Sequence, residues 1–142
     1  MPDEFIDTSV LVYAFDLSEP GKHAVAAGLI TDLSERNEKG IVSNQVLLEL
    51  YNVLTRFISN PVPADEASTI VEKFMSSPDW TKLNYDASTV RHAVLSATGN
   101  RAKIWDTLIA ETMRENNIDT IITENVKDFK KIPGIKVINP FK

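Results

Sequence analysis

Short apolar segments rich in β-branched residues alternate along this chain with longer stretches in which apolar residues recur every three or four positions. A strand that pairs in parallel with the one before it needs a crossover, which is usually a helix. The alternation therefore predicts a three-layer α/β/α sandwich with a central, mainly parallel sheet. The expected strands are residues 5–6 with their flanks, 40–43, 80–83, 120–123 and 135–138.

The expected helices carry start and stop signals. Ser43 or Asn44 is expected to cap the helix that runs to about residue 59, and Asp86 to cap a later helix that residues 99–100 stop. The inner face of that later helix is expected to consist of Ala87, Val90, Val94 and Ala97. The other helical stretches are 22–36, the residues between Pro63 and Pro78, and 104–116.

The composition bounds the class of protein. The chain has 142 residues, 43% of them apolar and 25% charged, which fits a single folded domain over 1–142. There is no cysteine, so disulfides, thiolate metal sites and cysteine nucleophiles are excluded. With no long apolar run and no export signal, a cytoplasmic location away from membranes is expected. The net charge of −5 argues against a surface that binds nucleic acid throughout, but it leaves room for a nuclease with a local basic rim.

Asp7 stands at the end of the first expected strand, where a carboxylate next to buried residues must have a structural or a chemical role. An Asp in this place usually caps the helix that follows. Thr8 and Ser9 come next and are able to cap that helix themselves, so Asp7 is available for another role. Residues 10–15 are expected to seat the helix on the sheet.

Two further acids lie on helices that follow strands. Glu49, in SNQVLLELYNVLTRF (43–57), falls outside a wide apolar arc and shares a polar stripe with Gln45, Asn52 and Arg56. The stripe is either a solvated surface or a face turned towards a cleft. Asp106, in IWDTLIAETMRENN (104–117), is in a first helical turn, where the helix dipole favours an acid without any function. Its neighbours are apolar, however, so it is not on an open charged face.

A fourth segment, TIITENVKDF (120–129), places Glu124, Asn125 and Asp128 after a strand. Alone it is typical of a turn. Because the carboxyl ends of parallel strands meet at one edge of a sheet, all four segments are expected to converge there. Carboxylates packed together need a divalent cation to remain ionised, and oxygen-only ligands favour Mg²⁺ or Mn²⁺ over Zn²⁺. Such sites serve phosphodiester or phosphoryl transfer.

At this point the sequence resembles a known family. The segments FIDTSVLVYAFD, SNQVLLELYNVLTR, IWDTLIAETMRENNIDTIITENVKDF and IPGIKVINP resemble, in order, the successive motifs of a PIN domain. The resemblance is closest to the VapC-type toxin ribonucleases of prokaryotic toxin–antitoxin modules, and it covers nearly the whole chain. It implies an endonuclease that cleaves RNA with Mg²⁺ or Mn²⁺, a small antitoxin whose tail fills the acidic groove, and a homodimer.

The resemblance also assigns residues. Asp7 matches the first metal-binding Asp of the family, Glu49 the Glu of the second motif and Asp106 the Asp that opens the third. Asn125 stands where many members have Asp, so Asp128 or Glu124 would supply the missing charge, and the fourth ligand stays open.

The mechanistic hypothesis follows from both lines of reasoning. Asp7 and Asp106 hold the metal, Glu49 positions or deprotonates the attacking water, and Asn125 or Asp128 fixes the outer shell. Candidates for hydrogen bonding to a carboxylate or phosphate oxygen are Thr8, Ser9 and Thr123. Candidates for holding the RNA backbone are Arg56, Arg101, Lys103 and Lys127.

Three alternatives remain. A haloacid-dehalogenase-like phosphatase needs a second Asp two residues after the first, and that position is Ser9. A response-regulator receiver needs a phospho-acceptor Asp on a middle strand, and no convincing one is present. The third alternative keeps the PIN fold but binds RNA or a partner without cutting, because Asn125 lacks a charge.

Overall fold

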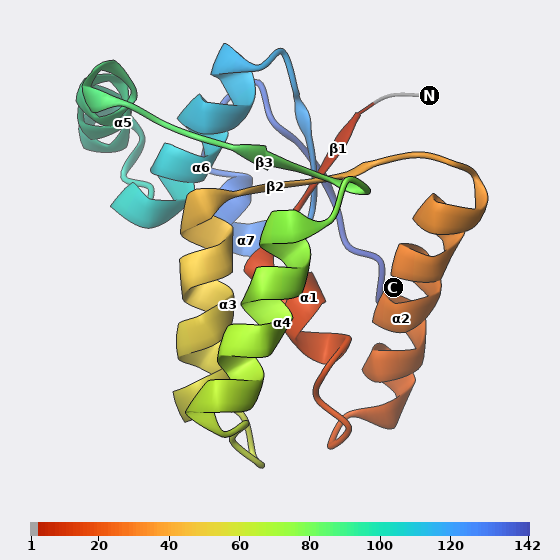
Figure 1. Cartoon of the computed structure of the whole chain (residues 1–142). Helices are drawn as coiled ribbons and strands as arrows, with labels where there is room; N and C mark the ends of the chain where they lie inside the picture. The colour runs from red at the N-terminus through yellow and green to blue at the C-terminus, as the bar shows by residue number, and fades with distance from the viewer. Residues whose placement is uncertain (1–2) are drawn as a thin grey trace.

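The computed structural model describes residues 3–142. Within them, five strands and seven helices alternate much as the sequence predicts (Figure 1). Among these residues no helix is both long and apolar enough to cross a lipid bilayer. In chain order the elements are β1 (Glu4–Ile6), α1 (Thr8–Tyr13), α2 (Pro20–Glu35), β2 (Gly40–Ser43), α3 (Asn44–Arg56), α4 (Ala64–Ser76), β3 (Trp80–Leu83), α5 (Ala87–Asn100), α6 (Ile104–Glu115), β4 (Thr120–Ile122), α7 (Val126–Phe129) and β5 (Lys136–Ile138).

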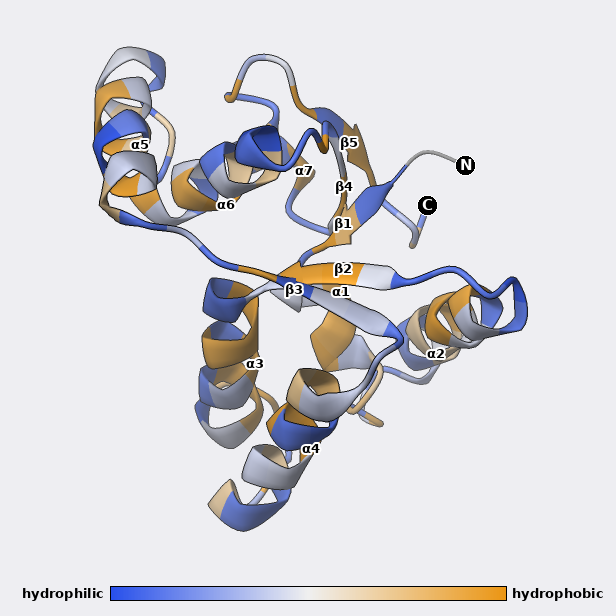
Figure 2. Ribbon diagram, turned by 45° about the horizontal axis from the view of Figure 1, so that its top comes forward, coloured by the Kyte–Doolittle hydropathy of each residue, from blue (hydrophilic) through white to orange (hydrophobic). Residues whose placement is uncertain are grey.

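The strands form one sheet in the order β3-β2-β1-β4-β5, and every pairing is parallel. Figure 2 shows α5, α6 and α7 on one side of the strands and α1, α2, α3 and α4 on the other. The predicted three-layer α/β/α sandwich is therefore confirmed. The chain adds β2 and β3 on one side of β1, and β4 and β5 on the other. The point where the strand order switches, which favours a site in open α/β sheets, therefore lies at the carboxyl end of β1.

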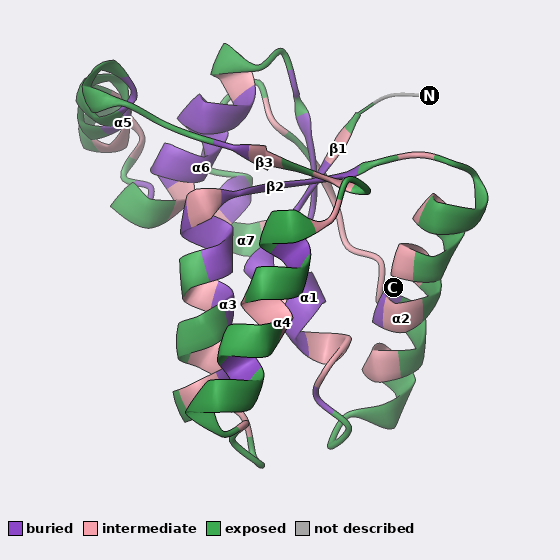
Figure 3. Ribbon diagram, in the orientation of Figure 1, coloured by how far each residue is buried: buried purple, intermediate pink, exposed green. Residues whose placement is uncertain are grey.

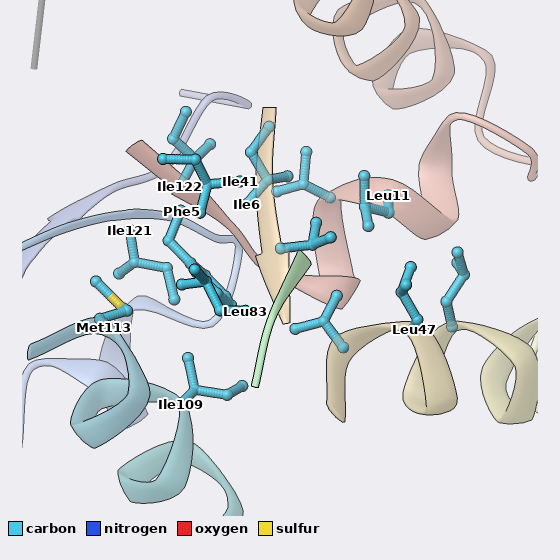
Figure 4. Close-up of a cluster of buried hydrophobic side chains, with 14 of the residues drawn as sticks. Phe5, Ile6, Leu11, Ile41, Leu47, Leu83, Ile109, Met113, Ile121 and Ile122 are labelled. Atoms are coloured by element: carbon cyan, nitrogen blue, oxygen red, sulfur yellow. The ribbon is translucent and has the colours of Figure 1, made fainter. Parts of the chain in front are cut away.

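The core lies on both faces of the sheet. Phe5 pairs in register with Ile121, and Ile6 pairs with Ile122, so the two pairs point to opposite faces. Figure 4 shows these side chains gathered with others from α1, α3 and α6, and all four are at most 6% exposed. Figure 3 shows the same pattern along the chain, with buried central strands and helices exposed on their outer sides. Burial of this kind holds β1 and β4 in place, and with them Asp7, which follows β1.

The capping predictions are confirmed in two places. The Ser43 hydroxyl accepts a hydrogen bond from the backbone N–H of Val46 at 3.3 Å, at the start of α3. Asp86 forms a capping box with Thr89 at the start of α5. Thr8 and Ser9 were expected to cap α1, but they lie inside it; Asp7 is the N-cap residue and makes no side-chain cap bond.

The predicted inner face of α5 is wrong. Val90 and Val94 are exposed, and the residues this helix buries are Thr89 and Ala93. The reason is that α5 packs against α6, where the Thr89 hydroxyl donates to Glu115 at 2.7 Å. The predicted stop at residues 99–100 is also one residue early, since the left-handed C-cap residue is Arg101.

Two smaller differences between the predicted and the observed helices lie near the site. α3 ends at Arg56 rather than near residue 59, and its C-cap residue, Phe57, is exposed. The segment after β4, expected as a turn, contains the short helix α7. Phe129, which closes α7, is fully buried and anchors that turn of helix to the core.

Candidate active site

Three of the predicted acids lie at the carboxyl edge of the sheet. Asp7 follows β1, Glu49 lies on α3 after β2, and Asp106 is in the first turn of α6. All three line one groove of about 500 Å³. The topology thus gathers side chains that are 42 and 57 residues apart in the sequence. We call Asp7, Glu49 and Asp106 the inner acids.

Asp7 is the most enclosed of the inner acids, with 7% of its surface exposed. Its backbone N–H donates to the carbonyl oxygen of Ile122 at 3.0 Å, which continues the β1–β4 pairing. Its Oδ2 accepts hydrogen bonds from the hydroxyl of Thr123 at 2.7 Å and from that of Ser9 at 3.1 Å. Burial raises the pKa of Asp7, and the two hydroxyl bonds oppose that rise.

The same two hydroxyls join Asp7 to the segment after β4. The Ser9 oxygen accepts from the backbone N–H of Glu124 at 3.1 Å, and the Thr123 oxygen accepts from that of Asn125 at 2.9 Å. Ser9 and Thr123 therefore lie where a carboxylate contact was predicted. Thr8 does not, because its hydroxyl donates to the carbonyl oxygen of Val46 at 3.3 Å and links α1 to α3.

Glu49 and Asp106 both have a raised pKa. Burial, followed by the nearby Asp7 charge, raises the pKa of Glu49 to about 7. Burial and then the charges of Asp7 and Asp128 raise the pKa of Asp106 to about 6, while Lys103 opposes the rise. The Asp7 charge thus makes ionisation of both Glu49 and Asp106 harder, as expected of neighbouring carboxylates that lack a cation between them.

Gln45 lies beside this pair, and sequence reasoning gave it no role. Its Nε2 donates to Glu49 Oε1 at 3.1 Å and to the backbone carbonyl of Trp105 at 3.0 Å. Within residues 3–142, the buried side-chain atoms without a hydrogen-bond partner are Gln45 Oε1 and Asp106 Oδ2. The sequence could have indicated the contact with Glu49, since Gln45 precedes Glu49 by one helical turn on the polar stripe.

Two further predicted acids of this region, Glu124 and Asp128, each have a lysine partner. Lys22 Nζ lies 2.5 Å from Glu124 Oε2, and the hydroxyl of Tyr13 donates to Glu124 Oε1 at 2.7 Å. Lys103 Nζ lies 2.9 Å from Asp128 Oδ2. The Lys103 bond lowers the pKa of Asp128, in contrast to the raised values of the inner acids. We call Glu124 and Asp128 the outer acids.

The remaining predicted residues lie around the groove. Asn125 lines it and immediately precedes α7. Arg56 is exposed at the end of α3, while Arg101, Lys103 and Lys127 are exposed near the start of α6 and on α7. In the described part of the chain no lysine or arginine lines the groove itself. Its acidic lining consists of Asp7, Asp16, Glu19, Glu49, Asp106 and Glu124.

The donor set suits a hard divalent cation. All candidate ligands are oxygens, and the unpartnered Asp106 Oδ2 is an acceptor with no donor. Across residues 3–142, however, no three Asp, Glu or His side chains stand close enough together to hold an ion between them. Mg²⁺ keeps several of its waters and commonly binds one or two carboxylates, so it fits this looser arrangement better than an ion that needs three or four protein ligands.

Comparison with known proteins identifies the family. A sequence model of the PIN domain matches residues 5–135, so the chain belongs to the PIN domain family. The resemblance expected from its motifs is thereby confirmed.

Individual relatives extend this finding. The chain is 28% identical over 139 residues to Ribonuclease VapC24 of Mycobacterium tuberculosis, with 95% of this chain and 94% of that protein covered. Among solved structures, VapC20 of Mycobacterium tuberculosis, described as a Sarcin-Ricin loop cleaving toxin, matches with a TM-score of 0.67 and 16% identity over 88% of this chain and 92% of that one. VapBC-1 of nontypeable Haemophilus influenzae matches with a TM-score of 0.68 and 18% identity over 98% of both chains. At these identities the structures show a shared fold.

Proposed function

We propose that this protein is an endoribonuclease that depends on Mg²⁺ or Mn²⁺, and that it is the toxin of a prokaryotic toxin–antitoxin pair acting in the cytoplasm. The observation that carries the proposal is the set of inner acids. They come from three elements, line one groove, and form no ion pair within residues 3–142. Membership of the PIN family and the ribonuclease relative point to the same chemistry.

In this proposal Asp7 and Asp106 hold the cation. When bound, the ion supplies charge neutralisation for the phosphate and acidifies a water molecule. Ser9 and Thr123 keep Asp7 oriented through its Oδ2. Glu49, whose pKa of about 7 suits proton transfer near neutral pH, orients the attacking water or takes its proton. Asn125 and Asp128 complete the outer shell on the α7 side.

The RNA backbone is expected to approach over the start of α6 and α7, because the groove itself is acidic. Arg101, Lys103 and Lys127 are exposed there, and Arg56 stands at the far end of α3. Phosphate contacts from such side chains position the strand without reading its sequence.

The acidic groove fits a basic segment of an antitoxin. Six acids and no lysine or arginine of the described chain line it, so a cationic peptide is complementary to it. One solved structure of the same fold is a toxin–antitoxin complex from Klebsiella pneumoniae. A tail bound there would also block access to the inner acids.

A homodimer is the expected oligomeric state. Leu48 on α3 and Trp105 on α6 are 72% and 62% exposed. The hydrogen bond from Gln45 to Trp105 brings these two helices together, so the two apolar side chains lie on neighbouring elements. Replacing Leu48 by Lys is expected to shift the protein from dimer to monomer, which light scattering coupled to size exclusion would measure.

Metal-dependent cleavage tests the enzymatic proposal. The wild-type protein should cleave structured RNA with Mg²⁺ or Mn²⁺, lose activity in EDTA, and regain it when the ion is restored. Asp7→Asn should reduce cleavage by a factor of about 100 or more, since it removes a direct ligand. Equal activity of the two proteins would overturn the assignment.

A PIN-fold protein that binds without cutting is the second candidate. It is favoured by Asn125, which brings no charge, and by the pairing of Asp128 with Lys103. Calorimetry with Mn²⁺ separates the two, because a non-catalytic module should bind the ion weakly or not at all.

A further inference from the structure

Gln45 joins the two helices that carry Glu49 and Asp106. It is 6% exposed, and its amide nitrogen bridges an acceptor on its own helix to an acceptor 60 residues away. The distant acceptor is the carbonyl of Trp105, which immediately precedes Asp106. One side chain therefore contacts a candidate catalytic group and the backbone that presents a candidate ligand.

The orientation of the amide follows from its neighbours. Glu49 Oε1 and the Trp105 carbonyl are both acceptors, so only the NH₂ group can face them. Turning the amide over would place its oxygen against two other oxygens. The donor geometry consequently leaves Gln45 Oε1 buried without a partner.

An unpartnered buried carbonyl is not what packing alone would select. Val46, Leu47, Leu50 and Leu54 of the same helix are buried and apolar, so an apolar side chain would suit this environment without leaving an orphaned oxygen. Instead the chain has an amide whose two hydrogens are both used at the site.

We propose that Gln45 is a positioning residue of this site, which sets the spacing between Glu49 and the start of α6 before an ion binds. The inference rests on the proposed function, since the spacing matters only if Asp7 and Asp106 hold a cation and Glu49 acts on the water beside it. Gln45 acts through Glu49 and through the Trp105 peptide, and it touches neither the ion nor the RNA. Partners of this kind typically change metal affinity by about 10- to 100-fold.

The principal test measures Mn²⁺ affinity by calorimetry. Gln45→Met keeps the length of the side chain but has no N–H donor, and is expected to weaken Mn²⁺ binding about 10-fold. Asn52→Met is the matched control, because Asn52 lies on the same stripe of α3 but is exposed, with no side-chain hydrogen bond in the described structure. It should bind Mn²⁺ as the wild type does. Equal affinity of Gln45→Met and wild type would overturn the inference. A wild type that does not bind Mn²⁺ would instead overturn the proposed function.

A double-mutant cycle distinguishes positioning from a general structural role. In a Glu49→Ala background, Gln45→Met should weaken Mn²⁺ binding by no more than about 3-fold, since one of its two contacts no longer exists. The same 10-fold loss in both backgrounds would show that Gln45 does not act through Glu49, and would overturn the inference.

A measurement on the wild type covers the case in which Gln45→Met does not fold. The side-chain amide resonances of Gln45 should shift during a Mg²⁺ titration, with the midpoint that calorimetry gives for the ion. Those of Asn52 should stay in place. Gln45 resonances that do not respond to saturating Mg²⁺ would contradict the proposal.

Discussion

The inner and outer acids lie within one region but differ in their partners: each outer acid has a lysine beside it, and in the described part of the chain no inner acid does. Glu124 and Asp128 each meet a lysine at 2.5 and 2.9 Å, and the pKa of Asp128 is lowered. Asp7, Glu49 and Asp106 have no such partner, and their pKa values are raised. The outer acids use their charge to hold elements together, tying the segment after β4 to α2 and α6. The inner acids form no ion pair within residues 3–142, which is expected of groups kept for a ligand.

The largest expected difference between the two sets is in metal affinity. Asp106→Asn should weaken Mn²⁺ binding on the order of 100-fold, because it removes one of two direct ligands, equivalent to about 3 kcal/mol. Asp128→Asn, which removes an already neutralised charge, should change it less than about 5-fold. Calorimetry on both variants makes the comparison. Equal losses would place Asp128 among the direct ligands.

The next effect is on pH dependence. Glu49 and Asp106 have pKa values of about 7 and about 6 without an ion, so lowering the pH from 8 to 5.5 protonates these two side chains. Mn²⁺ affinity should therefore fall about 10-fold or more across this range, with protons released on binding. Calorimetry in buffers of different ionisation enthalpy measures both quantities. An affinity that does not vary between pH 8 and pH 5.5 would contradict the raised pKa values.

A smaller effect is on the stability of the metal-free protein. The pKa of Glu49 is about 7 in the folded state against an ordinary value of 4.5, so between these values the folded state binds more protons than the unfolded state. Its stability therefore falls as the pH rises through that window. Glu49→Gln removes this penalty and should add about 1 to 2 kcal/mol at pH 8 after allowance for solvent screening, or about 3 to 6 °C in melting temperature.

The gain from Glu49→Gln should vanish near pH 4, where Glu49 is protonated in both states. Glu124→Gln provides the contrast, because it weakens a bonded acid and should not raise the melting temperature at either pH. Thermal unfolding in EDTA at both pH values tests this. A stabilised Glu124→Gln would remove the distinction between the two sets.

The smallest expected effect concerns Lys103. Its side chain is 70% exposed, so its pair with Asp128 contributes little to stability, and Lys103→Met should shift the melting temperature by less than about 2 °C. Mn²⁺ affinity at pH 8 should rise about 2- to 3-fold, since a positive charge that repels the ion is lost and Asp128 is left without its lysine partner. Repeating the calorimetry at high salt should reduce that difference.

Much of the fold could be predicted because its signals are local. The β-branched runs at 40–43 and 120–123 form strands, and the capping signals of Ser43 and Asp86 act within three residues. α5 shows the limit of such reasoning. Its valines have helical spacing, but the neighbouring helix covers the other face, which buries Thr89 and Ala93. Which face of a helix is buried depends on its partner, and spacing alone does not specify the partner.

The candidate site could be predicted in outline for a similar reason. In a parallel sheet, residues that follow strands meet at one edge, which brings Asp7 and Glu49 together. Asp106 begins α6, which follows α5 and leads back into β4, and a helix that leads into a parallel strand also starts at that edge. The lysine partners of the outer acids could not be predicted. Lys22 reaches Glu124 from 102 residues away, and no sequence pattern relates them. Gln45 was visible as part of a stripe, but its second contact, at Trp105, exists only in the folded chain.

The place of β4 in the sheet has a consequence for biosynthesis. Asp7 and the Thr123 hydroxyl that holds it are 116 residues apart, and β4 pairs directly with β1. Contacts this distant in sequence form late and slowly. A growing chain therefore contains Asp7 and Glu49 before Asp106 and the strand that orients Asp7 have been made. For the proposed ribonuclease, the site is therefore assembled only after β4 has been made and has paired with β1.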